Sequence, residues 1–104
     1  MARMLVIYET PKDKDAFLKH YFDVHIPLAK TLPGIRKYVV SQNSIISAMG
    51  DTDVFLIGEL HFDSLDAIKA AFASEEGRAC AADRKIFAPD DDKIKMYLFD
   101  TLDA

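Results

Sequence analysis

The hydrophobic positions of this chain follow two kinds of pattern, one with the period of a strand and one with the period of a helix. Four segments rich in β-branched and aromatic residues end at turn-forming residues, which is typical of β-strands. They are residues 4–8, 35–41 (with an extension to Ile46 left open), 53–62 and 94–99. In the first, third and last segments both sets of alternating positions are apolar, so both faces of the predicted sheet are apolar.

A helical pattern of apolar positions lies between the first two strands. The helix is expected to begin near Lys14, capped by Asp13 or Asp15, and to run to about His25. Proline disfavours the helical conformation of the residue before it, so Pro27 predicts a break or kink at this point. One further helical turn is expected before the next proline and glycine end the region.

A second helical region follows the third strand. Asp63 or Ser64 can cap one helix, and Ser74 begins another that runs to about Lys85. The first of these helices carries an apolar stripe formed by Leu65, Ile68 and Phe72. Small residues in the second helix favour close packing against a neighbour. A turn through the aspartates at 90–92 leads into the last strand.

The predicted order of elements is β-α-β-β-α-β, the order of the ferredoxin-like fold. In this α+β fold, helices cover one face of an antiparallel sheet. The chain has 104 residues and no repeat or linker, so we expect one domain over residues 1–104. The helices can cover only one of the two apolar sheet faces. We therefore expect the other face to pair with a second copy in a homodimer.

Composition and charge narrow the classes of partner. The net charge is −4 and the lysines and arginines are scattered, so the basic surface of a nucleic-acid-binding protein is not expected. No apolar run reaches membrane-spanning length, and the first residues lack the pattern of a signal peptide, so no membrane association is expected. Cys80 is the one cysteine, which excludes an internal disulfide and favours a cytoplasmic location.

The first helix carries an ionisable group where a core-facing stripe normally has none. At about 100° per residue, the stripe consists of Phe17, Leu18, Tyr21, Phe22, Val24, Leu28 and Leu32. His25 projects from near the centre of this stripe, and His20 lies at one edge. A neutral imidazole in an apolar pocket can act as a general base or hydrogen-bond donor towards a small organic substrate. The alternative is a core histidine bonded to a backbone carbonyl near Pro27.

Several residues near His25 are candidates for contact with a substrate. Tyr21 lies one turn before His25 and can orient a substrate oxygen or hold the imidazole tautomer, or it is simply an aromatic core residue. His20 either lines the mouth of a pocket or is a half-exposed surface residue. Tyr8 and Arg36 lie at strand ends, and Arg36 either anchors a carboxylate or is a surface or dimer-contact charge.

Other polar residues have alternative roles that the sequence leaves open. Glu59 and His61 are expected on the same strand face as Phe55 and Ile57, as an acid–base pair or as a polar pair at the dimer interface or sheet edge. Cys80 is expected to be a small buried hydrophobic residue.

No metal or nucleotide site is expected. His20 and His25 lie about 140° apart on a regular helix and cannot chelate one ion together, although a distortion near Pro27 would weaken this argument. The glycines are isolated and form no phosphate-binding loop.

One stretch of the chain resembles a known family. The segment Phe17-x-x-His20-Tyr21-x-x-x-His25-x-Pro27-Leu28-Ala29, followed by Leu32-Pro33-Gly34-Ile35-Arg36-x-Tyr38, is similar to the signature of the EthD family. This resemblance implies a ferredoxin-like protomer, dimerisation through the sheets into a dimeric α/β barrel, and a pocket between sheet and helices. The family is named after a protein associated with the degradation of ethyl tert-butyl ether. Its superfamily includes cofactor-independent monooxygenases, lactone isomerases and haem-degrading enzymes.

The resemblance implies an EthD-like catabolic protein, with an oxidoreductase of the cofactor-independent monooxygenase type as the expected activity, and the apolar stripe around His25 suggests a small, apolar, oxygen-bearing substrate. The expected catalytic residues are His25 and Tyr21, and the expected substrate contacts are His20, Tyr8, Phe17, Val24, Leu28 and Arg36. No cofactor is expected, so an oxidation would use dioxygen and the substrate's own electrons, or a partner oxidase. The alternatives are isomerisation by proton transfer, a non-catalytic ligand-binding module, and a structural dimer whose pocket is filled by side chains.

Overall fold

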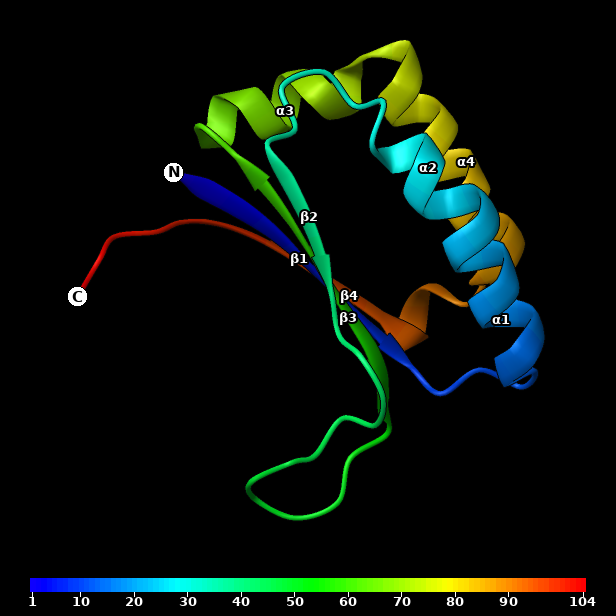
Figure 1. The fold of residues 1–104 in the computed structure, drawn as a ribbon. Coiled ribbons are helices and arrows are strands. Elements are labelled where there is room, and N and C mark those ends of the chain that lie inside the picture. The colour runs from blue at the N-terminus through cyan, green and yellow to red at the C-terminus, as the bar shows by residue number, and fades with distance from the viewer.

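A four-stranded antiparallel sheet forms one layer of the protein, and helices cover one of its faces (Figure 1). The computed structural model describes residues 1–104. The strands are β1 (Ala2–Glu9), β2 (Lys37–Val40), β3 (Val54–Phe62) and β4 (Ile94–Asp100), in the spatial order β2-β3-β1-β4. The helices are α1 (Lys14–His20), the π-turn η1 (Tyr21–His25), α2 (Ile26–Ala29), α3 (Leu65–Ala73), α4 (Glu75–Phe87) and the short 3₁₀ turn η2 (Asp91–Lys93). This arrangement confirms the predicted ferredoxin-like α+β fold.

The core lies between the sheet and the helices. Every second side chain of β1 and β3 is buried there, beginning at Ala2 and ending at Phe62. The serines predicted as caps begin the two later helices: Ser64 accepts a hydrogen bond from the backbone N–H of Ala67, and Ser74 accepts one from Gly77. None of the helices is both long and apolar enough to cross a membrane.

The second strand is shorter than predicted. It ends at Val40, and residues 41–53 form a long loop that projects from the sheet (Figure 1). Asn43 has a φ of 63° and Gly50 a φ of 105°, which the backbone of a strand does not adopt. The extension to Ile46 is therefore wrong, and the side chain of Ile46 is 89% exposed.

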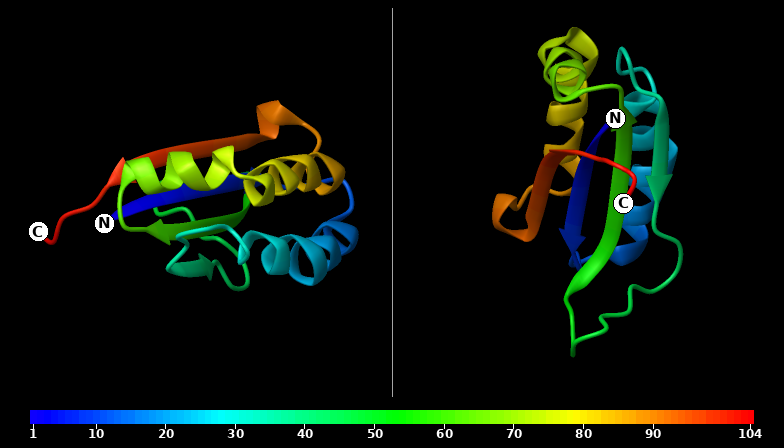
Figure 2. Two further views of the ribbon diagram at one scale, coloured as in Figure 1. Left: turned by 90° about the horizontal axis from the view of Figure 1, so that it is seen from above. Right: turned by 90° about the vertical axis from the view of Figure 1, so that its left-hand side faces the viewer.

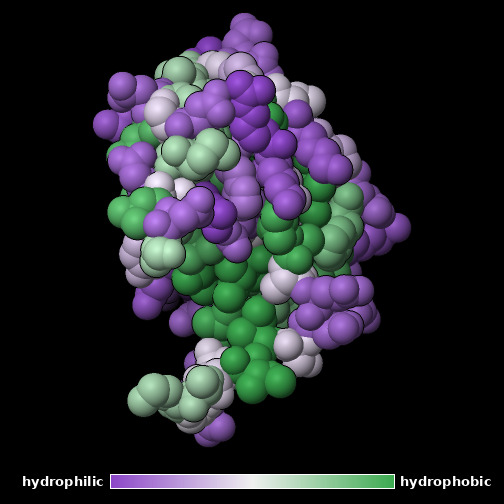
Figure 3. Space-filling view, turned by 60° about the vertical axis from the view of Figure 1, so that its left-hand side comes forward, coloured by the Kyte–Doolittle hydropathy of each residue, from purple (hydrophilic) through white to green (hydrophobic).

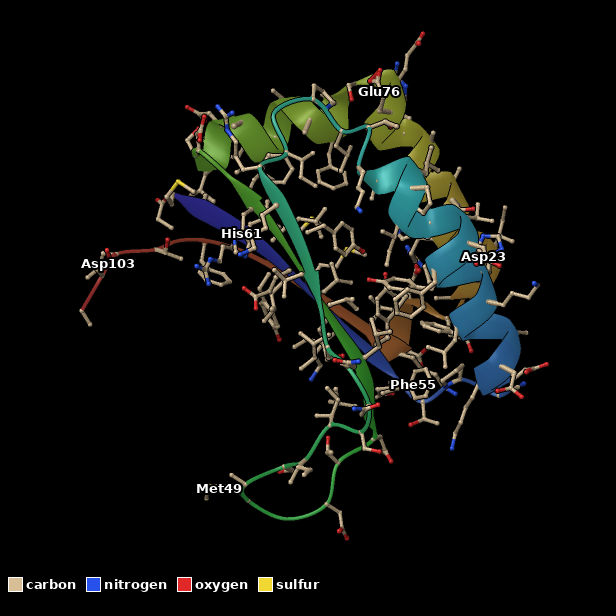
Figure 4. All side chains as sticks on the ribbon, in the orientation of Figure 1. Asp23, Met49, Phe55, His61, Glu76 and Asp103 are labelled. Carbon is tan, nitrogen blue, oxygen red and sulfur yellow. The ribbon has the colours of Figure 1, made fainter.

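A β-bulge changes the direction of one aromatic side chain. Tyr8 pairs with Leu56 and Glu9 pairs with Val54, so Phe55 has no partner in β1. Its ring packs edge-on against Phe17 at 5.5 Å, on the side of α1 (Figure 4). The prediction that Phe55 shares a face with Ile57 is wrong, because the extra residue turns it towards the helices.

The first helical region does not break at Pro27. It continues to Ala29, but the stretch Tyr21–His25 is a π-turn in which the N–H of Ile26 donates to the carbonyl of Tyr21. In a regular α-helix the ring of Pro27 would meet the carbonyl four residues earlier, and the wider turn relieves that contact.

The π-turn also corrects the predicted stripe. Tyr21 and His25 are buried, whereas Phe22 is 46% exposed and Val24 is 44% exposed. The regular 100° spacing used to predict the stripe does not hold through a π-turn, so these two side chains lie on the solvent side.

No helix covers the outer face of the sheet (Figure 2, right). Its apolar side chains come from all four strands: Leu5, Ile7, Val39, Ile57, Tyr97 and Phe99. Tyr97 is 50% exposed and Phe99 is 39% exposed. Figure 3 shows hydrophobic side chains gathered across the middle of this side of the molecule. The sheet is therefore apolar on both faces, as the alternation pattern predicts.

Candidate functional site

A carboxylate on α4 joins the two histidines of the first helical region. Asp83 Oδ1 lies 2.8 Å from His20 Nε2, and Asp83 Oδ2 lies 2.8 Å from His25 Nδ1. Asp83 and His25 are both 7% exposed. The sequence analysis missed Asp83, although its position three residues after the buried Cys80 places it on the inward face of α4.

The π-turn makes this convergence possible. In η1 the backbone hydrogen bonds join residues five apart, which brings His20 and His25 to the same side of the helical region. The prediction that these two side chains diverge is therefore wrong. Their common partner is Asp83, and no group of three His, Cys, Asp or Glu side chains has the arrangement of metal ligands.

The hydrogen bonds fix the tautomer of His25. An ionised carboxylate only accepts hydrogen bonds, so His25 Nδ1 carries the proton and Nε2 keeps its lone pair. Burial lowers the pKa of His25 below 6.5, and Asp83 opposes this only in part. Burial by itself would raise the pKa of Asp83, but the bonds from His20 and His25 lower it overall. At neutral pH the site thus holds a charged Asp83 and a neutral His25.

His25 lies in the wall of a cavity of about 160 Å³ between the sheet and the helices. Most of the lining is apolar. Its polar groups besides His25 are Tyr8, Tyr38, Cys80 and Arg84, and Arg84 Nη1 binds the carbonyl of Ala88 and the carboxylate of Asp91. Met96, on the edge strand β4, also lines this cavity and is 41% exposed, so the cavity reaches the surface beside this strand. Burial raises the pKa of Cys80 to about 11, so its side chain is a thiol at neutral pH.

His20 faces a different space. It lines a larger cavity of about 430 Å³ together with Tyr8, Phe17 and Phe87, and that cavity also has charged residues in its wall. The ring of Phe87 stacks on His20 at 5.5 Å and packs on His25 at 4.7 Å, so it contacts both imidazoles. We place the chemistry in the smaller cavity because its wall is more apolar and contains His25.

Tyr21 binds Tyr38 rather than the Asp83 carboxylate. It is fully buried, its ring stacks on that of His25 at 5.6 Å, and its hydroxyl lies 2.6 Å from the hydroxyl of Tyr38. Asp83, rather than Tyr21, holds the tautomer of the imidazole. Tyr38 is the second polar residue of this cavity that the sequence analysis did not select.

The remaining candidates lie outside the smaller cavity. Phe17 belongs to the aromatic core, where it packs on Tyr8 at 5.3 Å. Leu28 packs against the core but lines neither of the two cavities. Val24 is exposed. The Arg36 guanidinium binds Asp63 at the surface, with Nη2 to Oδ2 at 2.7 Å.

Glu59 and His61 lie on the outer face of the sheet, away from both cavities. Figure 4 shows His61 on this side. Glu59 accepts a hydrogen bond from Arg3 at 3.2 Å. His61 Nε2 is 3.4 Å from Glu59 Oε1, yet the geometry is not that of a hydrogen bond and this nitrogen is buried without a partner. These residues form a polar group within the apolar outer face.

Comparison with known proteins decides the family. The model of the EthD domain matches residues 9–91 of the chain. The chain belongs to the EthD family. The chain is also similar to the crystal structure of an ethyl tert-butyl ether degradation (EthD) family protein from Bacillus halodurans. The two share 30% identity over 98% of this chain and 99% of the other, with a TM-score of 0.87. The resemblance seen in the sequence is thus confirmed.

Two further relatives extend the comparison. An 11.0 kDa protein from the thcB–thcC intergenic region of Rhodococcus erythropolis is 31% identical over 88 residues, which is 85% of this chain and 84% of that protein. SnoaB, a cofactor-independent oxygenase from Streptomyces nogalater, has a TM-score of 0.70 over 99% of this EthD chain and 94% of its own. The identity to SnoaB is 13%, so that likeness shows the fold alone.

We expect Asp83→Asn to destabilise the protein by about 1–3 kcal/mol, because an amide cannot accept from both imidazoles as a carboxylate does. The free energy of unfolding in urea measures this loss. The matched control is Asp63→Asn, which removes an exposed carboxylate paired with Arg36 and should change stability by less than about 1 kcal/mol. Equal effects of the two substitutions would contradict a structural role for the buried carboxylate.

The pKa shifts predict that acid weakens the fold. Folding lowers the pKa of His25 below 6.5. Its contribution to the free energy of unfolding is therefore complete above pH 6.5 and declines as the pH falls below that value. Asp83 has its pKa lowered below 3.8, so its contribution is lost only in stronger acid. An NMR titration of His25 should give a midpoint below 6.5, and a lower midpoint still in Asp83→Asn. A higher midpoint in that variant would contradict the proposed electrostatics.

Proposed function

We propose that this EthD protein is an enzyme that removes a proton from a small, mostly apolar, oxygen-bearing compound held in the 160 Å³ cavity. His25 is the general base. One observation carries this proposal: a neutral imidazole in a cavity wall has its Nδ1 held by Asp83, which leaves the lone pair of Nε2 for a ligand. A base in such a position contributes about 10²- to 10⁴-fold to a proton-transfer step.

Asp83 and His20 support the base. When His25 accepts a proton at Nε2 it becomes an imidazolium, and the adjacent carboxylate stabilises that charge. His20 donates to the other oxygen of Asp83, and this second bond holds the carboxylate in position beside His25. His20 and Asp83 are therefore positioning residues, because they act on the reaction through His25.

The size of the cavity indicates the size of the ligand. An apolar cavity of about 150 Å³ in another protein binds benzene. The cavity in this protein has about 160 Å³ and thus suits a compound of about one ring. Most of its lining, including Met4, Val6, Leu60 and Phe72, is apolar and favours hydrocarbon surface, and Arg84 is the one charged side chain in the wall.

We propose oxidation as the reaction that follows proton removal. His25 takes a proton from a C–H or O–H group, and the electron pair stays on the substrate. Dioxygen takes this electron pair and bonds to the carbon as a peroxide. Loss of the hydrogen that remains on that carbon breaks the O–O bond, so a methylene or ring C–H position becomes a carbonyl and hydroxide leaves. The hydroxide takes the proton from His25 and departs as water. The likeness of fold to a cofactor-independent oxygenase supports this choice over isomerisation, in which the proton returns to another carbon.

Oxygen consumption tests the proposed enzyme. We would present the protein with a panel of phenols, cyclic ketones and tert-butyl ethers and follow dioxygen uptake and product mass. The unmodified protein should convert at least one class of compound. The rate of that conversion should fall by about 10²- to 10⁴-fold in His25→Gln. The matched control is His61→Gln on the outer face of the sheet, which should retain activity. Panel members that bind to the cavity without any conversion would favour the alternative, a ligand-binding module.

We also propose that the protein is a homodimer formed through the outer faces of two sheets. That face carries apolar side chains from all four strands. It also carries the polar group of Glu59 and His61, in which the buried Nε2 of His61 has no hydrogen-bond partner. Monomers rarely expose an apolar surface of this extent. A second copy would cover the face and bring further polar atoms to His61 and Glu59.

Light scattering tests this assembly. The mass in solution should be about twice the 11.7 kDa of the chain. Phe99→Asp should shift the protein towards the monomer, because it places a charge in the proposed interface. The matched control is Phe22→Asp, which changes a phenylalanine of similar exposure on the helical side and should leave the dimer intact. A monomeric mass of the unmodified protein at micromolar concentration would contradict the proposal.

A further inference from the structure

We propose that Tyr38 donates a hydrogen bond to an oxygen atom of the ligand, and that this bond selects ligands of about one ring that carry a carbonyl, ether or phenol oxygen. The inference rests on the proposed function because it concerns the same cavity. Tyr38, on β2, is then a ligand-binding residue, and its bond with Tyr21 makes its hydroxyl a donor towards the ligand.

The first step concerns the direction of the bond between the two tyrosines. Tyr21 is fully buried, and its hydroxyl has one partner, the hydroxyl of Tyr38 at 2.6 Å. If Tyr38 were the donor, the hydroxyl hydrogen of Tyr21 would be buried with no acceptor, which costs free energy. Tyr21 therefore donates to the oxygen of Tyr38.

The second step follows from the first. Since Tyr38 accepts the bond from Tyr21, its own hydroxyl hydrogen remains free, and no acceptor within the protein takes it. Burial raises the pKa of Tyr38 to about 12, so this hydrogen stays in place at neutral pH. Tyr38 lines the same cavity as His25. The bond from Tyr21 also polarises the Tyr38 hydroxyl and strengthens it as a donor.

A glycine on β3 keeps the tyrosine pair in place. A Cβ atom at Gly58 would lie 2.9 Å from the hydroxyl oxygen of Tyr21 and 3.6 Å from that of Tyr38. Any larger residue at this position would push the Tyr21 hydroxyl away. The two hydroxyls thus occupy space that only glycine leaves free on this strand. The absence of a side chain at this position therefore helps to fix the position of the tyrosine pair.

The third step joins the donor to the base. The mainly apolar lining contains an acceptor, the imidazole of His25, and several donors: Tyr8, Tyr38, Cys80 and Arg84. Arg84 Nη1 binds the Ala88 carbonyl and Asp91, whereas the Tyr38 hydroxyl accepts from Tyr21 and keeps its own hydrogen for a ligand. A compound with an oxygen next to an acidic C–H or O–H satisfies both groups. When His25 takes the proton, negative charge develops on that oxygen, and the bond from Tyr38 stabilises it.

Two isosteric probes test the bond without any turnover. Cyclohexanone and methylenecyclohexane have nearly the same shape and differ in a C=O or C=CH₂ group. We would measure the Kd of each from amide NMR shifts, in the unmodified protein and in Tyr38→Phe. Desolvation of the ketone is the same in both proteins, so the change in the ratio of the two Kd values reports the hydrogen bond itself.

We expect Tyr38→Phe to reduce the preference for the ketone by about threefold to tenfold, as one neutral hydrogen bond does. Tyr97→Phe, an exposed tyrosine on β4, should leave the ratio unchanged. An unchanged ratio in a folded Tyr38→Phe protein would overturn the proposal. So would the failure of both probes to bind the unmodified protein at millimolar concentration.

A spectroscopic measurement keeps the proposal testable if Tyr38→Phe does not fold. In the unmodified protein, the carbonyl stretch of bound cyclohexanone should move to lower frequency than in an alkane, because it accepts a hydrogen bond. An alkane-like frequency would overturn the proposal. These readouts also separate the two proposals: a protein that binds the ketone through Tyr38 but converts no substrate would contradict the enzyme and leave the Tyr38 assignment standing.

Discussion

The buried carboxylate of Asp83 is the interaction on which the arrangement of the site depends. A charge with 7% exposure is tolerable only where hydrogen bonds replace its water, and both oxygens of Asp83 receive one from an imidazole. Those two bonds tie α4 to the region that spans α1 and η1. They also determine which nitrogen of His25 is free. Packing between helices and the chemistry of the imidazole are thus set by the same side chain.

The cavity is supported from two sides by different means. On the side of α4, a charged group orients the imidazole of His25. On the side of the sheet, a pair of neutral hydroxyls places a donor, and Gly58 on β3 provides the room for it. Tyr21 connects the two sides, since its ring packs on His25 while its hydroxyl binds Tyr38. A single residue of the π-turn therefore contacts both polar components of the site.

The elements of the fold could be predicted from the sequence because they depend on local patterns. Alternation identified β1 and β3, and the serines at 64 and 74 identified the starts of α3 and α4. The error at Phe55 came from a bulge, which inserts one residue into a strand without a local sequence signal.

The site was predictable in part, for the same reason. His25 was evident from its place on an apolar stripe. Asp83 and Tyr38 were not, because each acquires its role from a contact with a residue that is distant in the sequence: Asp83 comes 58 positions after His25, and Tyr38 comes 17 positions after Tyr21. The convergence of His20 and His25 was missed because the regular helical period was assumed through η1.

The π-turn has a consequence for the evolution of this protein. A turn of this kind holds one residue more than an α-helical turn, so it can be regarded as an insertion that the surrounding helix has absorbed. Removal of one residue between His20 and His25 would leave the two histidines four residues apart in an ordinary α-helix, a spacing that also directs both side chains to one face. With the present spacing of five residues, the two imidazoles reach the carboxylate on α4 together only because the turn is a π-turn. Substitutions at the exposed Phe22 and Val24 are tolerable in this view, whereas a change that returns this segment to regular α-helical hydrogen bonds without a deletion is not. The five-residue spacing of the histidines and the π-turn therefore depend on each other, and the identity of the side chains between them matters less.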